Sequence, residues 1–391
     1  MEAKTSQTEP DSLKENGLHF GIRVSIKALS LFVIFNLLFA VFYPPAAAKR
    51  VSAYNLLFPG RQRLPYGEIP EKSYNISLYD LEAMFASHEL SNRNKPKDEY
   101  RIILIGDSST WGFLLTPDQT LAAYLNREQI SLPHNQKVKV YNLGYPTMSL
   151  TKDLLILSFA MQYQPDMILW PLTLESFPYD KQLFSPLLQN NPGKVRGLIK
   201  DYNLNLDLQD PKLKTPSFWD KTILGSRRNL ADLFRFQLYG VLWAATGIDQ
   251  FIPKDYEKRQ EDLPADENFH ELAPPKLNET DLAFEILSAG VSMARSSPVV
   301  FINEPIFISQ GLNSRIRYNF FYPRWAFDDY RRLMMEKSSA NRWYYWDFWD
   351  SVAPSEFTNT AIHLTPNGNQ QFARLLAQVI LSVASSTISN Q

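Results

Sequence analysis

The chain has 391 residues, of which 45% are hydrophobic and 13% aromatic, so it can bury the core of a large domain and is not a disordered protein. The formal net charge of −1 excludes the basic surface of a typical nucleic-acid-binding protein. The absence of cysteine excludes disulfides, thiolate metal sites and cysteine nucleophiles. We expect no nucleic-acid partner, no metal site and no cofactor.

The first feature along the chain is the apolar run Ala28–Tyr43, in which Asn36 is the only strongly polar residue. As a helix it would extend about 24 Å at ~1.5 Å per residue, which with its flanks can cross a bilayer core of about 30 Å. We expect a cytoplasmic tail at 1–22, disordered over 1–20, and a single transmembrane anchor at 23–45, with the main domain extracytoplasmic. A signal peptide cleaved near Ala46–Ala48 and a buried core helix are the alternatives.

An ordered extension is expected over 46–98, rich in Pro, Arg, Tyr and Asn. It begins as a long loop and ends in a short helix from about Tyr79 to His88. We interpret His88 as a surface or interface residue.

The main domain, 99–391, alternates strand and helix patterns. Short apolar runs rich in β-branched or aromatic residues predict strands at 100–105, 137–142, 167–172, 298–302 and 344–347. Helical spacing appears at 117–125, with Thr116 as its cap, and at 150–163, 279–295, 330–336 and 365–385. This alternation predicts an α/β fold in which helices cover both faces of a parallel sheet, a three-layer α/β/α architecture.

The pattern lapses over 179–275, which is rich in Asn, Asp, Pro and Lys. A bare loop of this length is unusual, so we expect a partly helical insertion that caps one edge of the sheet. Its apolar island, Leu238–Ala245, is expected to pack on the core; contact with a membrane surface is the alternative.

The sharpest local motif is Ile105–Gly112, IGDSSTWG, directly after the first strand. A turn that leaves a parallel strand places Ser108 at the carboxyl edge of the sheet, where ligands bind in open α/β folds. Free backbone N–H groups in such a turn can stabilise an oxyanion. Alternatively, Asp107 or Ser108 merely forms an Asx-type turn.

A second motif, Phe357–Asn369, places His363 in a loop before the last helix. A serine hydroxyl needs a positioned base to become a good nucleophile, and histidine titrates nearest neutrality. Ser108 and His363 are therefore a candidate catalytic pair.

GDSSTWG after the first strand and HLTPNGN at 363–369 together resemble the SGNH/GDSL hydrolase superfamily. The resemblance implies an SGNH-type, flavodoxin-like sheet with Ser108 as nucleophile and His363 as base. It also implies that Gly144, in the second block, is an oxyanion donor.

Two blocks depart from the family pattern. The third block should supply an oxyanion Asn, but the chain reads WPLTLES over 170–176, where Thr173 or Ser176 would have to replace it. The fifth block should have Asp three residues before the histidine, but Thr360 is there, preceded by Asn359. We therefore expect a neutral acceptor to orient His363, which stabilises imidazolium less than a carboxylate does.

Other residues could line the same edge. Asn303 and Glu304 follow the fourth strand, and Tyr322–Trp325 mixes aromatic and charged residues, although a packed loop explains them equally well. Asp347 and Asp350 lie upstream of His363 and are interpreted as strand-end or cap residues.

The whole layout resembles single-anchor extracytoplasmic SGNH proteins of the alginate O-acetylation and D-alanyl-transfer systems, some of which cooperate with multi-pass membrane O-acyltransferases. That likeness implies a membrane-anchored serine O-acyl esterase or acyltransferase whose substrate is an acylated glycan or another cell-surface ester. The alternative is a catalytically weak or inactive module that binds glycan or scaffolds a membrane O-acyltransferase.

Overall fold

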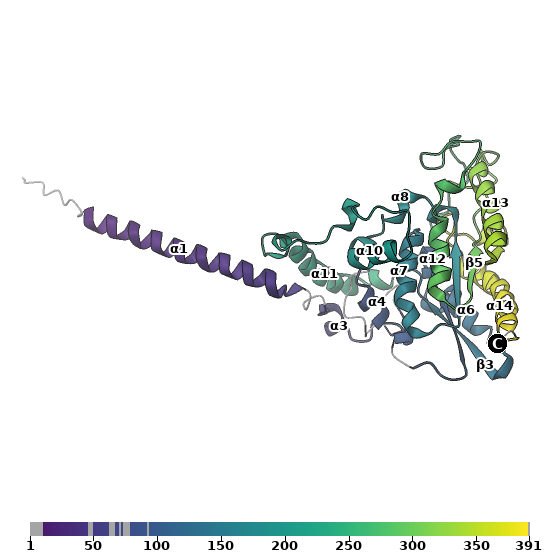
Figure 1. The fold of residues 1–391 in the computed structure, drawn as a ribbon, viewed down its shortest axis with the longest axis horizontal. Helices are drawn as coiled ribbons and strands as arrows, with labels where there is room; N and C mark the ends of the chain where they lie inside the picture. The colour runs from purple at the N-terminus through teal and green to yellow at the C-terminus, as the bar shows by residue number, and fades with distance from the viewer. Residues whose placement is uncertain are drawn as a thin grey trace, which may run out of the picture. The chain divides into compact units, whose positions relative to one another are not determined.

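The computed structural model describes residues 11–45, 50–61, 67–69, 72, 79–91 and 94–389 (Figure 1). The chain divides into two compact units, one made of Met1–Val51 with Thr215–Tyr239 and the other of Ser52–Lys214 with Gly240–Gln391. The candidate signal-cleavage residues Ala46–Ala48 and the first ten residues lie outside the described part, as does much of the loop expected before Tyr79.

The second unit is built on one six-stranded sheet in the order β2-β3-β1-β4-β5-β6. The short β2 pairs antiparallel with β3, and the other neighbouring strands pair in parallel. Numbered among themselves, the parallel strands run 2-1-3-4-5, which is the flavodoxin-like order. The predicted strands are confirmed at β1 (Glu99–Leu104), β3 (Gln136–Asn142), β4 (Met167–Leu172), β5 (Val299–Asn303) and β6 (Tyr344–Asp347); β2 (Ser131–Leu132) was not predicted.

The central strand β1 shows why these sequences form a parallel sheet. Ile102 is aligned with Val140 of β3 on one side and with Met167 of β4 on the other. All residues of β1 and β4 are buried. A strand covered on both faces and both edges needs mostly apolar residues, and the two charged residues of β1 are buried as a pair, with Arg101 Nε donating to Glu99 Oε1 at 2.6 Å.

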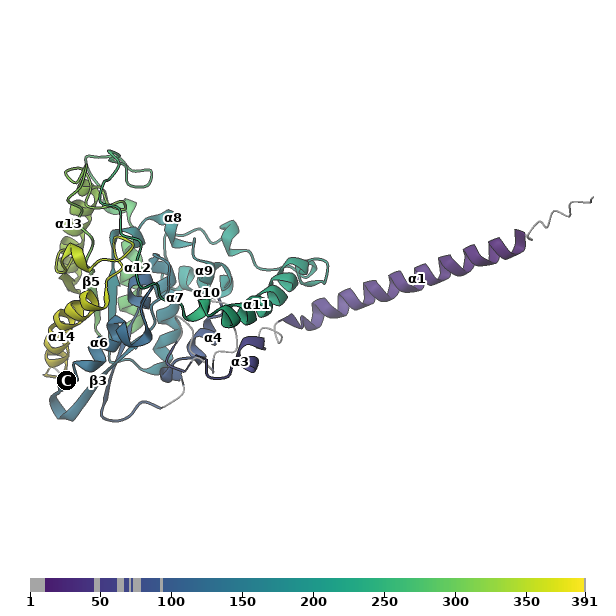
Figure 2. The same cartoon turned by 180° about the vertical axis from the view of Figure 1, so that it is seen from behind.

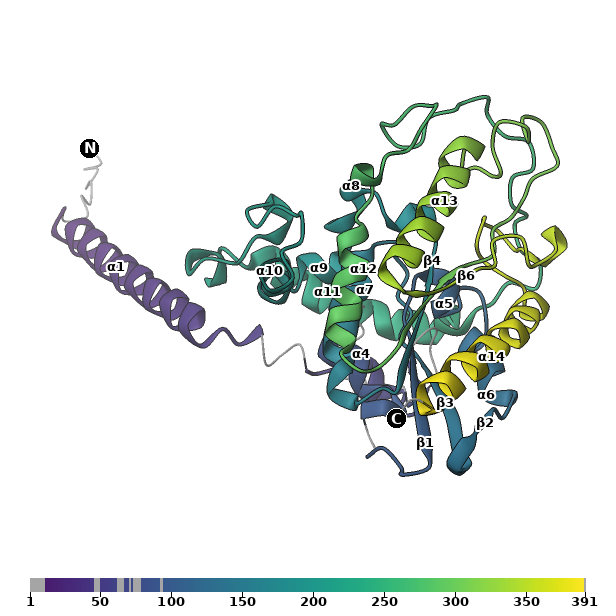
Figure 3. The ribbon, with the colours of Figure 1, turned by 45° about the vertical axis from the view of Figure 1, so that its right-hand side comes forward.

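Helices cover both faces of the sheet (Figures 1 and 3). On one face, α7 (Leu150–Ala160) packs beside α12 (Phe284–Ala294). On the other, α6 (Leu121–Arg127) lies side by side with α14 (Pro366–Ser389), the yellow helix of Figure 2. The predicted three-layer α/β/α architecture is therefore confirmed.

The remaining helices connect these layers and form the insertion. The predicted helix at 330–336 is part of the longer α13 (Arg324–Asn341), and the predicted helix at 79–88 is α4 (Leu81–Ala86), capped by Asp80. The insertion is partly helical, as predicted. The other helices are α3 (Ala53–Leu57), α5 (Ser108–Trp111), α8 (Tyr179–Gln182), α9 (Pro186–Gln189), α10 (Pro192–Asp201) and α11 (Arg227–Thr246).

The N-terminal helix of the first unit, α1 (Asp11–Phe42), begins earlier than expected. The expectation of a disordered tail up to residue 20 is therefore wrong from Asp11 onward. Between Pro10 and residue 20 there is no proline to break a helix, and Leu, Lys and Glu favour one. Its stretch His19–Phe42 is long and apolar enough to span a membrane. By the same criterion Pro366–Ile388 of α14 also qualifies, but that helix buries one face in the core.

The expectation that the island Leu238–Ala245 packs on the core is wrong. Leu238, Leu242 and Trp243 are exposed along α11, and within this helix only Gly240 and Ala244 are buried. The buried side of the island thus consists of two small residues, which allow close approach but leave the large apolar side chains outside.

Candidate active site

The turn between β1 and α5 positions Ser108. Asp107 caps α5, because its Oδ1 accepts the Ser109 N–H at 2.8 Å, and Ser108 is the first helical residue. Gly106 is required here, since a Cβ at this position would lie 2.4 Å from Thr110 Oγ1. The serine therefore stands at the carboxyl end of the central strand, as the motif predicts.

Ser108 and His363 meet at this edge. Ser108 Oγ lies 2.8 Å from His363 Nε2, and His363 Nδ1 lies 3.1 Å from Asn359 Oδ1. An amide oxygen only accepts, so Nδ1 carries the proton and Nε2 is free to accept from the serine. Thr360 makes no hydrogen bond to the ring among the described residues; its Oγ1 accepts the backbone N–H groups of Ile362 and His363 and so shapes the loop.

The environment of His363 favours the neutral imidazole. The side chain is buried, with the ring of Phe113 centred 5.0 Å away. Burial lowers the pKa of His363 to about 4, although the negative charge of Asp107 acts in the opposite direction. A neutral imidazole at neutral pH is ready to accept a proton.

Glu304 lies beside the nucleophile turn. The Ser109 hydroxyl donates to Glu304 Oε2 at 2.5 Å. Burial, and then the nearby charge of Asp107, raise the pKa of Glu304 well above its usual range, and the bond from Ser109 offsets this only in part. The surroundings of Glu304 thus favour its protonated form, and it makes no hydrogen bond to His363 among the described residues.

Asn303 and Asp347 are not brought to Ser108. Asn303 Nδ2 donates to Asp347 Oδ1 at 2.7 Å, and Arg331 Nε donates to Asp347 Oδ2 at 2.8 Å. Asp350 is exposed. Asn303, Asp347 and Arg331 thus hold β5 and β6 together. Within the described residues, no upstream carboxylate replaces the missing partner of His363.

Gly144 approaches α5, the short helix that begins at Ser108, closely. A Cβ at Gly144 would lie 2.4 Å from Trp111 N, so glycine is needed for this contact. Its N–H donates to Asn142 Oδ1 at 3.0 Å, whereas the Ser108 N–H has no acceptor among the described residues. In this arrangement the Ser108 N–H is open to an acceptor, and the Gly144 N–H would have to leave Asn142 to point at the same acceptor.

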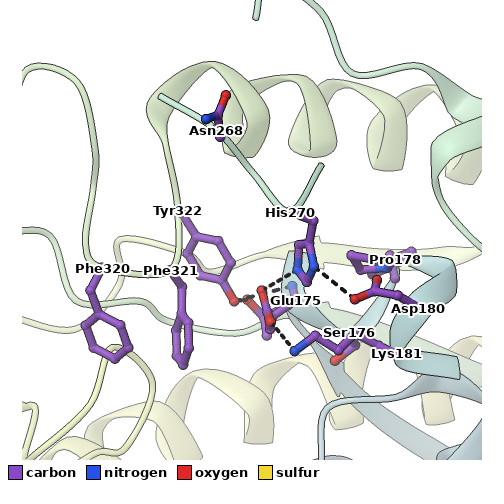
Figure 4. Close-up of polar contacts among 12 residues, drawn as sticks. Glu175, Ser176, Pro178, Asp180, Lys181, Asn268, His270, Phe320, Phe321 and Tyr322 are labelled. Atoms are coloured by element: carbon purple, nitrogen blue, oxygen red, sulfur yellow. Dashed lines mark hydrogen bonds and ion pairs between the residues drawn. The ribbon is translucent and has the colours of Figure 1, made fainter. Parts of the chain in front are cut away.

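The third-block region forms a separate polar cluster (Figure 4). Thr173 Oγ1 pairs with the Tyr322 hydroxyl at 2.7 Å and contacts neither Ser108 nor His363 among the described hydrogen bonds. Glu175 lies between His270 Nε2 at 3.2 Å and Lys181 Nζ at 2.8 Å.

His270 is bound at both ring nitrogens, because its Nδ1 also meets Asp180 Oδ2 at 3.2 Å. The hydrogen bond with Glu175 raises the pKa of His270 against the effect of burial. Burial opposes ionisation of Glu175, but the bonds from His270 and Lys181 outweigh it and lower its pKa. The sequence patterns do not predict this cluster; the one available signal is that Glu175 lies three residues after the end of a predicted strand.

A pocket of about 80 Å³ opens beside the nucleophile helix. His88, interpreted above as a surface or interface residue, is instead buried in its wall, and its Nδ1 lies 3.3 Å from Glu68. The extension therefore contributes to the pocket, whose lining includes Gly67, Glu68, Met84, His88, Trp111, Gly112, Leu115, Asn142 and Gly144.

No protein-family model matches the chain, and no curated protein matches it. Solved structures similar to it include a lipase/acylhydrolase from Enterococcus faecalis, 14% identical, with a TM-score of 0.36 over 72% of this chain and 95% of that one. A Mycobacterium smegmatis aryl esterase is 14% identical with a TM-score of 0.33, covering 72% and 98% of the two chains. A carbohydrate acetylesterase family member from Sinorhizobium meliloti is 11% identical with a TM-score of 0.31, covering 72% and 96%. Sequence identities and TM-scores this low assign no activity to the chain. The chemistry of the site therefore follows from the geometry of its own residues.

Proposed function

We propose that the chain is an SGNH-type serine O-acyl esterase or acyltransferase. One observation carries this proposal: Ser108 Oγ, His363 and Asn359 Oδ1 form a continuous line, with contacts of 2.8 and 3.1 Å, at the carboxyl edge of the parallel sheet. A nucleophile, a neutral base and a group that orients the base are the parts that acyl transfer needs.

The reaction follows from these positions. His363 Nε2 takes the Ser108 hydroxyl proton while Oγ bonds to the acyl carbon, and the Ser108 N–H donates to the oxyanion. The ester C–O bond then breaks, and the imidazolium returns its proton to the leaving alcohol. Water or a second hydroxyl, deprotonated by His363, attacks the acyl-serine and releases Ser108.

The substrate class in this proposal is an acylated glycan or another cell-surface ester outside the cytoplasm. It is supported by α1, whose stretch His19–Phe42 is long and apolar enough to anchor the chain in a membrane. A multi-pass membrane O-acyltransferase is the protein partner that such an anchor would make accessible.

Labelling with a fluorophosphonate probe tests the enzyme directly. The purified full chain should form one covalent adduct, which Ser108→Ala abolishes. Ser109→Ala is the matched control: the neighbouring serine donates to Glu304 and not to His363, so its loss should leave the adduct in place. No adduct on the folded wild-type chain, or an undiminished adduct on Ser108→Ala, would overturn the proposal.

A non-catalytic module remains the second candidate, and one observation favours it. The Gly144 N–H is already bonded to Asn142 Oδ1, which leaves a single open oxyanion donor at Ser108. A folded wild-type chain that takes no label but binds an acylated glycan would support this function instead.

A further inference from the structure

The unit made of Met1–Val51 and Thr215–Tyr239 exposes large apolar side chains outside α1. We call five of them the apolar surface: Phe218, Trp219, Leu224, Phe234 and Leu238 are exposed by 43%, 69%, 57%, 72% and 58%. Phe234 and Leu238 are four residues apart on α11 and therefore share a face of that helix. Phe218 and Trp219 are also in contact, with ring centroids 5.6 Å apart. Large apolar side chains exposed to this extent mark an interaction surface.

This surface is joined to α1 within the stretch that can span a membrane. Asn36 is buried, and its Oδ1 accepts the Leu224 N–H at 3.4 Å. Phe42, the last residue of α1, lies six residues beyond Asn36, or about 9 Å at ~1.5 Å per residue. If the apolar layer extends to Phe42, Leu224 lies inside that layer, at the ~5–10 Å depth of interfacial helices.

The backbone of this segment is suited to such a depth. Polar backbone groups in an apolar layer must be bonded internally. Thr222 N donates to Trp219 O at 3.2 Å, Gly225 N to Thr222 Oγ1 at 3.0 Å, and Ser226 N to Thr222 O at 2.8 Å. Together with the Leu224–Asn36 bond, these contacts close the turn before α11.

The charged residues of the segment suit a lipid headgroup layer. Lys221, Arg227, Arg228 and Arg235 outnumber Asp220 and Asp232, so residues 215–239 carry a positive balance. Arg and Lys side chains can extend to the headgroups while their neighbours enter the apolar layer.

We propose that the apolar surface inserts into the membrane leaflet that holds the C-terminal end of α1, so that the chain is bound to the bilayer by a second, interfacial element. This inference rests on the proposed membrane anchoring by α1. We choose lipid as the occupant because the contact between Leu224 and Asn36 lies within the candidate membrane span of α1. A surface that faced water at this point would be polar, whereas this one is apolar.

The absence of cysteine permits a direct test with single-cysteine variants of the full chain. Trp219→Cys, Phe234→Cys and Leu238→Cys are labelled with an environment-sensitive NBD dye and reconstituted in phosphatidylethanolamine–phosphatidylglycerol vesicles. Leu31→Cys reports on the anchor. Asn229→Cys is the matched control, exposed on the same helix but away from the Phe234–Leu238 face.

Spin-labelled lipid should quench the dye at the three surface positions at least about twofold more than at Asn229→Cys, as expected for side chains that enter the acyl region. Quenching at Leu31→Cys with water-like emission at all three positions would overturn the inference and leave the anchor intact. Blue-shifted emission without lipid quenching would also overturn it, by indicating a protein partner or a second copy. Loss of quenching at Leu31→Cys would overturn the anchor and the inference together, while the serine-probe experiment would still test the enzyme.

Discussion

The orientation of His363 by an amide has a chemical consequence at the scale of single residues. Asn359 Oδ1 fixes the tautomer, as a carboxylate would, but brings no charge to stabilise the imidazolium that the proposed reaction would form on deprotonating Ser108. Burial further disfavours that cation and lowers the pKa of His363 to about 4. The base is therefore available over a wide pH range but is weak.

Changing Asn359→Asp tests this account. The reaction requires neutral His363, so activity is lost as pH falls through its folded pKa. We expect the acid limb of kcat/KM for an aryl acetate to lie below about pH 6.5 in the wild type. The carboxylate should move the limb to higher pH and raise kcat at neutral pH by about tenfold.

Thr360→Asp is the control for that experiment, because Thr360 Oγ1 contacts backbone N–H groups and not the ring. A matching shift in Thr360→Asp, or an unmoved limb in Asn359→Asp, would contradict the assignment of Asn359 as the group that orients His363.

A site residue can be predicted from the sequence when it lies in a short motif, and not when only the tertiary fold brings it to the site. Ser108 and His363 lie in motifs at element junctions, and Asn359 is within one loop of His363, so short spacings identify them. Glu175 and His270 are 95 residues apart, and His270 lies in an insertion without periodic pattern. Their pairing is set by tertiary packing, which no local pattern records.

At the scale of elements, Lys152 connects the two loops that form the site. Its buried Nζ donates to Gly106 O at 2.7 Å and to Tyr145 O at 3.2 Å, and pairs with Asp153 Oδ1 at 2.5 Å. One side chain of α7 thus fixes the turn before Ser108 and the loop that carries Gly144.

We expect Lys152→Met to lower the free energy of unfolding by about 3–5 kcal/mol, the cost of removing one partner of a buried ion pair. Urea unfolding of the detergent-solubilised chain measures it. Adding Asp153→Asn removes the orphaned charge and keeps an acceptor for Trp170 Nε1, so the double variant should recover part of the loss. A double variant as unstable as Lys152→Met would show that the ion pair is not the cause.

The sequence predicts elements well where burial on both faces requires a mostly apolar run, as at 100–105, which the structure gives as Glu99–Leu104. The start of α1 at Asp11 and the exposure of Leu238 and Leu242 were missed. Apolar residues at helical spacing predict a helix but do not say whether protein or another medium covers it.

At the scale of the whole molecule, the Glu175–His270 pair attaches the insertion to the end of β4. The pKa of His270 is raised, so its contribution to stability is complete below about pH 6.5 and is lost as pH rises through the folded value. The pKa of Glu175 is lowered, so its contribution is complete above about pH 4.5 and is lost as pH falls through its folded value.

Within that window, near pH 5.5, His270→Gln should lower the free energy of unfolding by about 1.5–3 kcal/mol, the range of a hydrogen bond to a charged group. The difference should shrink when the measurement is repeated at alkaline pH, above the raised folded pKa of His270, where the wild-type side chain has lost its proton. His134→Gln, at an exposed histidine outside the cluster, is the control. Equal losses at both pH values would exclude a charged His270.

The separation of Ser108 from His363 by 255 positions affects how the protein matures. Synthesis from the N-terminus delivers α1 first and the serine soon after, but the base arrives only with the loop before α14, the final helix. In the proposed reaction, a nascent or prematurely terminated chain would therefore carry Ser108 without its base. Ester turnover would begin only once α14 has packed against α6 and His363 has reached the serine.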